Sequence, residues 1–389
     1  MTFSIDKSTW RKVRFGDVVN NVNDVVRNPS ALGIDRVIGL EHLDPGELAV
    51  SRWDTIEDGT SFTRRVRPGQ TLFGKRRSYQ RKTAYVTFDA ICSGDILVFY
   101  PKDPEVLLPG LLPFIASSDA FYEVALRTSA GSLSPRTRWS DMAAFEFLLP
   151  PLAEQQRISA LVGSAHSHLK HVREALVHAL ELQRTYRDDY MRSIGKRAKA
   201  SEVFDITIGR QRSPKHAQGE HMVPYLRSAN ITRTGIDIDD VMQMNFTPAE
   251  QEIFQLKEGD VLVSEGSASL SAVGQPAVWE GRIDETVCFQ NTLLRYRALE
   301  RTTSTDFVKH WCRWAHESGQ FASVAHGTGI LHIGLKNARS MTVPIPTASE
   351  QKCFVIAMAE LERTEIDLAN NEVLTQRLMG TLLRDLLGD

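Results

Sequence analysis

The densest group of side chains that could do chemistry is the stretch GKRRSYQRK, residues 74–82. With Gly69 it completes G-x-x-x-x-G-K, the start of a phosphate-binding loop. The next residue is Arg76, where such a loop needs a serine or threonine for magnesium. The residues that follow indicate a loop and a strand, whereas phosphate binding needs the N-terminus of a helix. The sequence therefore argues against a nucleotide site here.

The same stretch fits an electrostatic role better. Residues 60–90 contain eight lysines and arginines and one acid, Asp89, although the 389-residue chain has a formal charge of only −2. Clustered cations displace counterions from DNA phosphates, arginine also contacts guanine, and glutamine pairs with adenine. We predict DNA contacts from Lys75, Arg76, Arg77, Tyr79, Gln80, Arg81 and Lys82. The alternative is a solvated basic loop without a partner.

Two turns rich in glycine and small hydroxyl residues are further candidates, SAGSLSPRTR (129–138) and HGTGILHIGLKN (326–337). Small residues let a backbone approach a duplex, and hydroxyl, amide and basic groups contact phosphates. The alternative is that both are ordinary turns. The predicted DNA contacts here are Ser132, Ser134, Arg136 and Arg138 in the first turn, and His326, Thr328, His332, Lys336 and Asn337 in the second.

A third candidate segment is SEGSASLSAVG (264–274), which follows the strand-like sequence GDVLV. Its place corresponds to that of the basic stretch in the first half of the chain, but it has no basic run. Contacts in the second half are therefore expected to be more polar, and the segment from 237 to 260 is acidic. The predicted contacts are Ser264, Ser267 and Ser269, together with Arg227 of VPYLRSANI.

Motifs for catalysis or metal binding are not found in the sequence. It has no nucleophile elbow, no H-E-x-x-H and no defensible pair of catalytic carboxylates. Pro150-Pro151 is flanked by leucines, unlike the Asn/Asp-Pro-Pro-aromatic loop of adenine methyltransferases. The four cysteines lack zinc-site spacing, and the histidines between 166 and 178 lack acidic or cysteine partners. We expect no catalytic residue and no metal site.

The composition is that of a globular protein, with 42% hydrophobic and 24% charged residues. The length allows two or three domains. No apolar run reaches the length of a membrane span, and the N-terminus has no signal-peptide pattern. We expect a cytoplasmic protein that does not contact a membrane.

An internal repeat organises the chain. RPGQTLF (67–73) resembles KEGDVLV (257–263), and FLLPPLAEQQRI (147–158) resembles VPIPTASEQKCF (343–354). The two Gly/Ser turns lie between these matches in the same order. The repeat predicts an α+β fold with two mixed α/β domains at 1–150 and 199–346, and two long helices at 151–198 and 347–389.

Both predicted long helices carry apolar residues at coiled-coil spacing, which in the first is broken at Gln183. A helix of about 43 residues is roughly 65 Å long. We predict that the two pair antiparallel, the alternative being two unrelated helices packed on their own domains. The second seam has a polar middle around Glu365 and Asn371. The predicted pairing residues are Ile158, Val162, Leu169, Val172 and Leu176 in the first helix, and Phe354, Met358, Leu361, Leu368, Leu378 and Leu382 in the second.

Taken together, the chain resembles the specificity subunit of Type I DNA restriction–modification systems over essentially its whole length. The resemblance is carried by LLPPLAEQQRI before a long helix, its divergent repeat PIPTASEQ, VPYLRSANI, LKEGDVLVSEG and TLFGKRRSYQRK. It implies two target recognition domains that read the two parts of a split double-stranded DNA target. It also implies that the antiparallel helices fix the unread spacer, and that the chain has pseudo-two-fold symmetry.

The resemblance further implies a chain without catalytic activity or a cofactor of its own. Two methylation subunits would carry S-adenosylmethionine and methylate adenine at N6, and restriction subunits with motor and nuclease activity would join them in phage defence. Two alternatives from other classes remain, namely a self-contained nuclease or methyltransferase, and a protein-binding scaffold that uses the helices alone.

Overall fold

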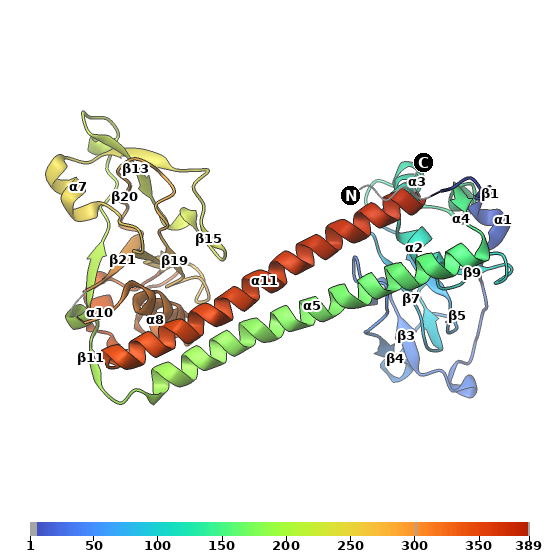
Figure 1. Cartoon of the computed structure of the whole chain (residues 1–389), viewed down its shortest axis with the longest axis horizontal. Helices are drawn as coiled ribbons and strands as arrows, with labels where there is room; N and C mark the ends of the chain where they lie inside the picture. Colours follow the sequence, from blue (N-terminus) through green and yellow to red (C-terminus); the bar gives the residue numbers. More distant parts are fainter. Residues whose placement is uncertain (1–5, 300–301, 388–389) are drawn as a thin grey trace. The chain divides into compact units, whose positions relative to one another are not determined.

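The computed structural model describes residues 6–299 and 302–387, which form a mixed α+β structure (Figure 1). The chain divides into two compact units. Unit 1 contains Met1–Arg173 and Asn370–Asp389, and unit 2 contains Glu174–Ala369. Both divisions fall inside the long helices α5 (Leu152–Ser193) and α11 (Ala348–Leu387), so each unit includes a segment of both helices. None of the described helices is long and apolar enough to cross a membrane.

Unit 1 is built on two four-stranded sheets. The first has the order β2-β9-β6-β7 and is antiparallel throughout, and the second has the order β4-β3-β8-β5 with β3 and β8 parallel. A two-stranded ribbon, β1-β10, leads into α5. The strands are β1 (Arg11–Arg14), β2 (Val19–Asn21), β3 (Arg36–Ile38), β4 (Asp54–Thr55), β5 (Arg64–Val66), β6 (Thr71–Gly74), β7 (Thr83–Tyr85), β8 (Ala90–Cys92), β9 (Ile96–Pro101) and β10 (Glu146–Leu149).

The main core of unit 1 is aromatic. Phe15, Phe73, Phe99 and Phe121 are fully buried, and the rings of Phe15 and Phe121 lie 4.8 Å apart at a tilted angle. Tilted and edge-to-face pairs of this kind add to the stabilisation from burial alone. This core includes residues of the helices α1 (Phe15–Val18), α2 (Leu112–Ser117), α3 (Asp119–Thr128) and α4 (Trp139–Ala143) and of the start of α5.

Unit 2 has a four-stranded antiparallel sheet, β12-β21-β17-β19, and a three-stranded sheet, β16-β13-β20, in which β13 and β20 are parallel. Three two-stranded ribbons complete its strands. The strands are β11 (Arg197–Lys199), β12 (Phe204–Ile208), β13 (Met222–Leu226), β14 (Ile231–Thr232), β15 (Gly235–Ile236), β16 (Met242–Asn245), β17 (Val261–Ser264), β18 (Gly266–Ser267), β19 (Pro276–Val278), β20 (Cys288–Phe289), β21 (Leu293–Ala298), β22 (Leu331–His332) and β23 (Thr342–Pro344).

Helix α8 supplies much of the core of unit 2. Trp311 is fully buried and lies against Tyr296 and Phe204, with ring centroids 5.8 and 5.0 Å away. The described helices of unit 2, apart from its segments of α5 and α11, are α6 (Ala200–Val203), α7 (Pro248–Phe254), α8 (Thr305–Glu317), α9 (Gln320–Val324) and α10 (Leu335–Ser340).

A buried glutamine near the start of α5 ties this helix to unit 1. The Gln155 amide nitrogen donates to the carbonyl oxygens of Val106 and Pro150, both at 2.9 Å, and its oxygen accepts from Leu108 N–H at 2.8 Å. In unit 2, Gln351 of α11 donates to Thr302 O at 3.0 Å and accepts from Ser304 N–H at 3.3 Å. Each glutamine therefore holds the loop that precedes the first core helix after the sheets, α2 in unit 1 and α8 in unit 2.

Within each unit α5 and α11 contact each other. In unit 1, Arg173 Nε donates to Glu372 at 2.8 Å and its Nη1 pairs with Glu47 at 2.6 Å. In unit 2, Gln183 Nε2 donates to Glu365 at 2.8 Å, and the rings of Tyr190 and Phe354 stack 4.0 Å apart. Polar side chains thus occupy the seam at the points where the sequence pattern is interrupted.

The seam of α11 differs from the predicted one at a single leucine. Leu378 is 50% exposed, whereas the next residue, Met379, is buried, as is Leu382. The prediction of Leu378 follows the spacing of the leucines alone. The heptad instead passes through the polar positions, in steps of four and three from Phe354 through Met358, Leu361, Glu365, Leu368, Glu372, Thr375 and Met379 to Leu382. The other predicted pairing residues are buried or half-buried.

Replacing Gln155 by alanine should lower the free energy of unfolding by about 1–3 kcal/mol, because it leaves buried backbone groups without partners. Urea unfolding followed by circular dichroism measures this. The neighbouring Gln156 is exposed, and Gln156→Ala is the matched control. Equal unfolding midpoints for the two variants would contradict the anchoring role of Gln155.

The corrected seam predicts opposite outcomes for two neighbouring residues. Met379→Ala removes a buried side chain and should destabilise unit 1 by about 2 kcal/mol. Leu378→Ala removes an exposed one and should change stability by about 0.5 kcal/mol or less. Thermal unfolding of the two variants compares these effects directly. A larger loss of stability in Leu378→Ala than in Met379→Ala would contradict the corrected seam and favour the one predicted from leucine spacing.

Candidate nucleic-acid interface

Two segments predicted to contact DNA lie together in unit 1. We call residues 75–82 the basic loop and residues 129–138 the Ser-Pro loop. Arg77 N–H donates to Pro135 O at 2.8 Å, and Thr137 N–H donates to Lys75 O at 2.9 Å. Backbone hydrogen bonds thus join the two loops into one surface just after β6.

The carboxylate of Asp95, which precedes β9, holds this junction together. Arg136 Nε lies 2.9 Å from one Asp95 oxygen and Arg76 Nη1 lies 3.3 Å from the other, while Arg76 Nε donates to Ser134 Oγ at 2.6 Å. Burial alone raises the pKa of Asp95, but the hydrogen bonds and charges of Arg136 and Arg76 outweigh it and lower that pKa below its ordinary value. Two of the predicted DNA-contacting arginines therefore share one internal carboxylate.

Two further cations of the basic loop also bind within the unit. Arg81 forms an ion pair with Asp119, and its guanidinium lies 5.0 Å above the Tyr122 ring. Lys82 Nζ donates to Leu40 O at 2.7 Å. Lys75 is half-buried, and burial, followed by the charge of Arg64, lowers its pKa. Arg81 and Lys82 therefore hold the loop in its conformation as well as adding positive charge to it.

The outer surface of the two loops carries Arg77, Tyr79, Ser132 and Arg138, all exposed. Among the described residues, the side chains of Arg77 and Arg138 have no hydrogen-bond or ion-pair partner. Tyr79 is 58% exposed. With the half-buried Gln80 it lines a cavity of about 420 Å³ beside Tyr122. An exposed aromatic ring among cations suits stacking on a base or sugar, and this contact stays a prediction.

Unit 2 brings its own two predicted segments together. β18 pairs with β22, so residues 266–267 lie beside residues 331–332. Glu265 accepts from His332 Nδ1 at 2.8 Å and from Gly334 N–H at 3.1 Å, and is nearly buried. The strand register matches that of unit 1, since Ser264 pairs with Leu293 as Gly74 pairs with Ile96. Glu265 therefore stands where unit 1 has Lys75.

Three predicted residues of unit 2 are buried or already paired within the unit. Ser264 is buried in β17, Asn337 donates to Val324 O at 3.1 Å, and Arg227 forms an ion pair with Asp240. The remaining predicted residues are half-buried or exposed, namely Ser267, Ser269, His326, Thr328, His332 and Lys336.

Sequence reasoning missed Asp95 and Glu265, the two acids around which these loops are arranged. Asp95 lies in the segment SGDILVF, outside the basic stretch, and Glu265 lies in SEGSASL between the predicted serines Ser264 and Ser267. Neither residue has a motif around it. Their importance comes from contacts with residues 41 and 67 positions away, which local sequence does not encode.

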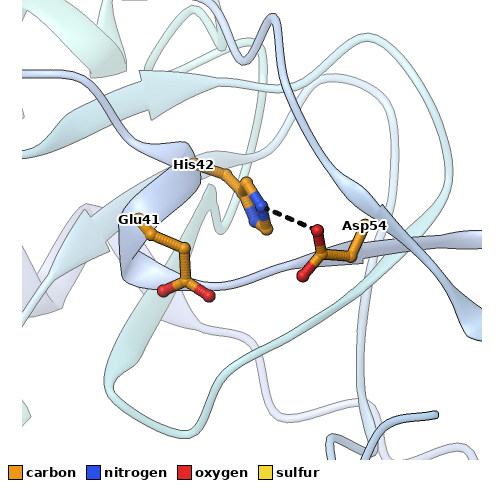
Figure 2. Close-up of side chains that lie close together, drawn as sticks. All are labelled: Glu41, His42 and Asp54. Atoms are coloured by element: carbon orange, nitrogen blue, oxygen red, sulfur yellow. Dashed lines mark ion pairs between the residues drawn. The ribbon is translucent and has the colours of Figure 1, made fainter. Parts of the chain in front are cut away.

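A different cluster, Glu41, His42 and Asp54, brings potential metal ligands within 4.8 Å of one another (Figure 2). Gly39 N–H donates to His42 Nδ1 at 2.9 Å, so the neutral ring carries its proton on Nε2, which faces Asp54 at 3.4 Å. A metal at this place would bind the lone pair of Nε2, so the ring proton would have to lie on Nδ1. That proton would then face the Gly39 N–H, and the hydrogen bond from Gly39 would be lost. The geometry therefore fits a structural bridge and does not fit a metal.

The corresponding residue of unit 2 supports this interpretation. Asn230 accepts from Arg227 N–H at 3.0 Å, as His42 accepts from Gly39, and donates to the carbonyl oxygens of Asp237 and Asp240 at 3.0 Å. His42 and Asn230 therefore both close a short helical turn by accepting from the backbone N–H three residues earlier. In unit 2 a neutral amide is sufficient for this role.

Comparison with known proteins places these features in a family context. No family model matches the chain. The specificity subunit of the Type I restriction enzyme EcoDI from Escherichia coli is 26% identical over 175 residues, which is 43% of this chain. The matched part spans 38% of that relative's own length.

Solved structures match along nearly the whole chain. A chain of a type I R-M system, whose complex assembly and conformational transition were analysed structurally, has a TM-score of 0.64 at 20% identity, covering 98% of both chains. The HsdS subunit from Thermoanaerobacter tengcongensis gives 0.51 at 20% identity, covering 97% of this chain and 96% of its own. The Type-I S subunit from M. genitalium gives 0.59 at 12% identity, covering 98% and 96%.

These matches confirm the resemblance expected from the sequence. The chain has the α+β fold of Type I specificity subunits, with a long helix in the middle and another at the C-terminal end. Part of its sequence also resembles one of them.

The junction at Asp95 predicts a stability effect with a defined pH dependence. Asp95→Asn removes the charge shared by Arg76 and Arg136 and should destabilise unit 1 by about 1 kcal/mol at pH 7, since the pairs are partly exposed. Because the folded-state pKa of Asp95 is lowered, its contribution is present above the ordinary value of 3.8 and is lost as pH falls through the lowered pKa.

Urea midpoints at pH 7 and below pH 3.8 test this prediction. The control is Glu123→Gln, at an exposed carboxylate of α3. If the difference in urea midpoint between wild type and Asp95→Asn were the same at both pH values, the ion pairs of Asp95 would not account for it.

Proposed function

We propose that this chain is the DNA sequence-specificity subunit of a Type I restriction–modification complex. The observation that carries the proposal is the junction of the basic loop and the Ser-Pro loop in unit 1. It gathers exposed cations, hydroxyl groups and one aromatic ring on a single surface, which suits phosphate and base contacts. The fold shared with Type I specificity subunits supports the same conclusion.

In this proposal units 1 and 2 each contain one target recognition domain, and the two domains are copies of one ancestral domain. The matched register of β6 and β17, the parallel pairs β3-β8 and β13-β20, and the anchoring glutamines of the two helices support a duplication. Each domain reads one part of a split double-stranded DNA target. Unit 2 reads its part with hydroxyl and imidazole groups, because an acid stands in its loop where unit 1 has a lysine.

The two long helices form an antiparallel coiled coil in this proposal and fix the length of the unread spacer. Their contacts within each unit and the alternating spacing of α11 support the coiled coil. The same helices bind two methylation subunits, through which restriction subunits join. Exposed apolar side chains suited to such contacts are Leu161, Val373 and Leu374 in unit 1, and Val177, Leu182, Ile356 and Ile366 in unit 2.

The chemistry in this proposal belongs to the partners. S-adenosylmethionine binds to the methylation subunits, which transfer its methyl group to adenine N6, and this chain selects the site without catalysis of its own. The complex acts on DNA in the cytoplasm, where it contributes to phage defence.

The test is to co-express the chain with the methylation subunit from the same genome and to map methylated adenines. We expect a two-part motif with a spacer of constant length. The double variant Arg76→Ala, Arg77→Ala should lose methylation at this motif while the complex still assembles. Equal methylation of all adenines by the wild-type complex would contradict the proposal, and DNA cleavage or methylation by the isolated chain would replace it with an enzyme.

A further inference from the structure

Two arginines of the basic loop have an unusual backbone conformation. Among the described residues other than glycine, only Arg77 and Arg81 have a positive φ, 55° and 52°. They flank the short helical turn η4 (Ser78–Gln80) on either side. A left-handed conformation is unfavourable for a side chain with a Cβ and persists only where the surroundings impose it. Backbone strain of this kind clusters at functional sites, which makes this loop a candidate for recognition.

The surroundings of the loop fix its backbone from both sides. On one side, Arg81 is held by Asp119 and by the Tyr122 ring. On the other, Arg76 is held by Asp95 and Ser134. Arg77 itself donates its N–H to Pro135 O at 2.8 Å, and its carbonyl accepts from Gln80 N–H at 2.9 Å.

The result is a backbone held by hydrogen bonds on both sides of Arg77, from which a free guanidinium extends. The Arg77 side chain is exposed and makes no hydrogen bond or ion pair with the residues that the structure describes. Its neighbours are engaged, since Arg76 and Arg136 share Asp95. A side chain that starts from a fixed backbone loses less freedom when it binds, so its geometry can discriminate between bases.

We propose that Arg77 is the residue of unit 1 that determines specificity for a guanine, through two hydrogen bonds from its guanidinium to O6 and N7 in the major groove. Arg76, Arg81 and Arg136 shape the loop, and Asp95 is a positioning residue. The inference deepens the proposed function and rests on it. Paired N–H donors on guanine O6 and N7 are the commonest specific contact between arginine and DNA.

Unit 2 offers an internal contrast. Ser267 follows Glu265 by two positions, as Arg77 follows Lys75, and the strand register makes the two positions equivalent. A serine hydroxyl is too short and has too few donors to replace a guanidinium. The half of the target read by unit 2 is therefore independent of this contact.

Unit 1 also contains a matched control. Arg138 is exposed and without a side-chain partner in the described part of the chain, but its backbone is ordinary, with φ −108° and ψ 151°. It precedes α4 at the end of the Ser-Pro loop, and it differs from Arg77 in its backbone conformation, because its φ is in the ordinary extended range. We assign it to phosphate contact, which strengthens binding to every sequence equally.

The experiment compares Arg77→Gly and Arg138→Gly in the complex with methylation subunits. Glycine adopts the φ of Arg77 without strain, so this variant should fold at least as well as wild type, which thermal unfolding checks. Methylated sites are mapped for each complex, and its affinity is measured on duplexes that carry the motif or one substitution in it.

For Arg77→Gly we expect discrimination at one G·C pair to fall by about tenfold to a hundredfold, with the other half of the motif unchanged. For Arg138→Gly we expect an unchanged motif and weaker binding to all duplexes. Weaker binding with the full motif retained in Arg77→Gly would make Arg77 a phosphate contact and overturn the inference, as would a wild-type motif without a G·C pair in either half. A wild-type complex without any motif would instead overturn the proposed function.

Discussion

One buried amide ties the start of each long helix to the unit that contains that start. Gln155 and Gln351 are almost inaccessible to solvent, and a buried amide must find partners for both its oxygen and its nitrogen. Each finds them in the loop before a core helix, so the direction in which α5 or α11 begins is linked to the core of its own unit. In the proposed function this link lets the start of each helix set the position of the recognition loops, because those loops and that helix start belong to the same compact unit.

The clustered cations of the candidate interface are paired with acids of the same unit. Many cations in one loop repel one another, and an acid paired with them in the same unit reduces that repulsion. Asp95 does this for Arg76 and Arg136, and Asp119 does it for Arg81. Unit 2 uses the opposite arrangement, in which Glu265 holds a histidine and a backbone N–H at the corresponding junction. One strand framework thus supports two surfaces of different charge.

Much of this architecture could be predicted from the sequence, and the exceptions have physical causes. The resemblance to Type I specificity subunits follows from motifs that begin helices and strands, which are local. The position of Leu378 could not be predicted from leucine spacing, because Glu372 and Thr375 keep the heptad phase although they are polar. The basic stretch was recognised as a group, yet the sequence did not separate the arginines that brace the loop from the one left free. That distinction depends on acids such as Asp119, 38 positions from Arg81.

The polar pairs between the long helices have a consequence for alignment. A purely apolar seam is nearly periodic, so two helices can slide by one heptad, about 10 Å, and still bury similar side chains. Such a slip would take Glu372 away from Arg173 in unit 1, and Glu365 away from Gln183 in unit 2. Each polar pair therefore fixes the alignment of α5 with α11 within its own unit, and a slip by one heptad would break that pair.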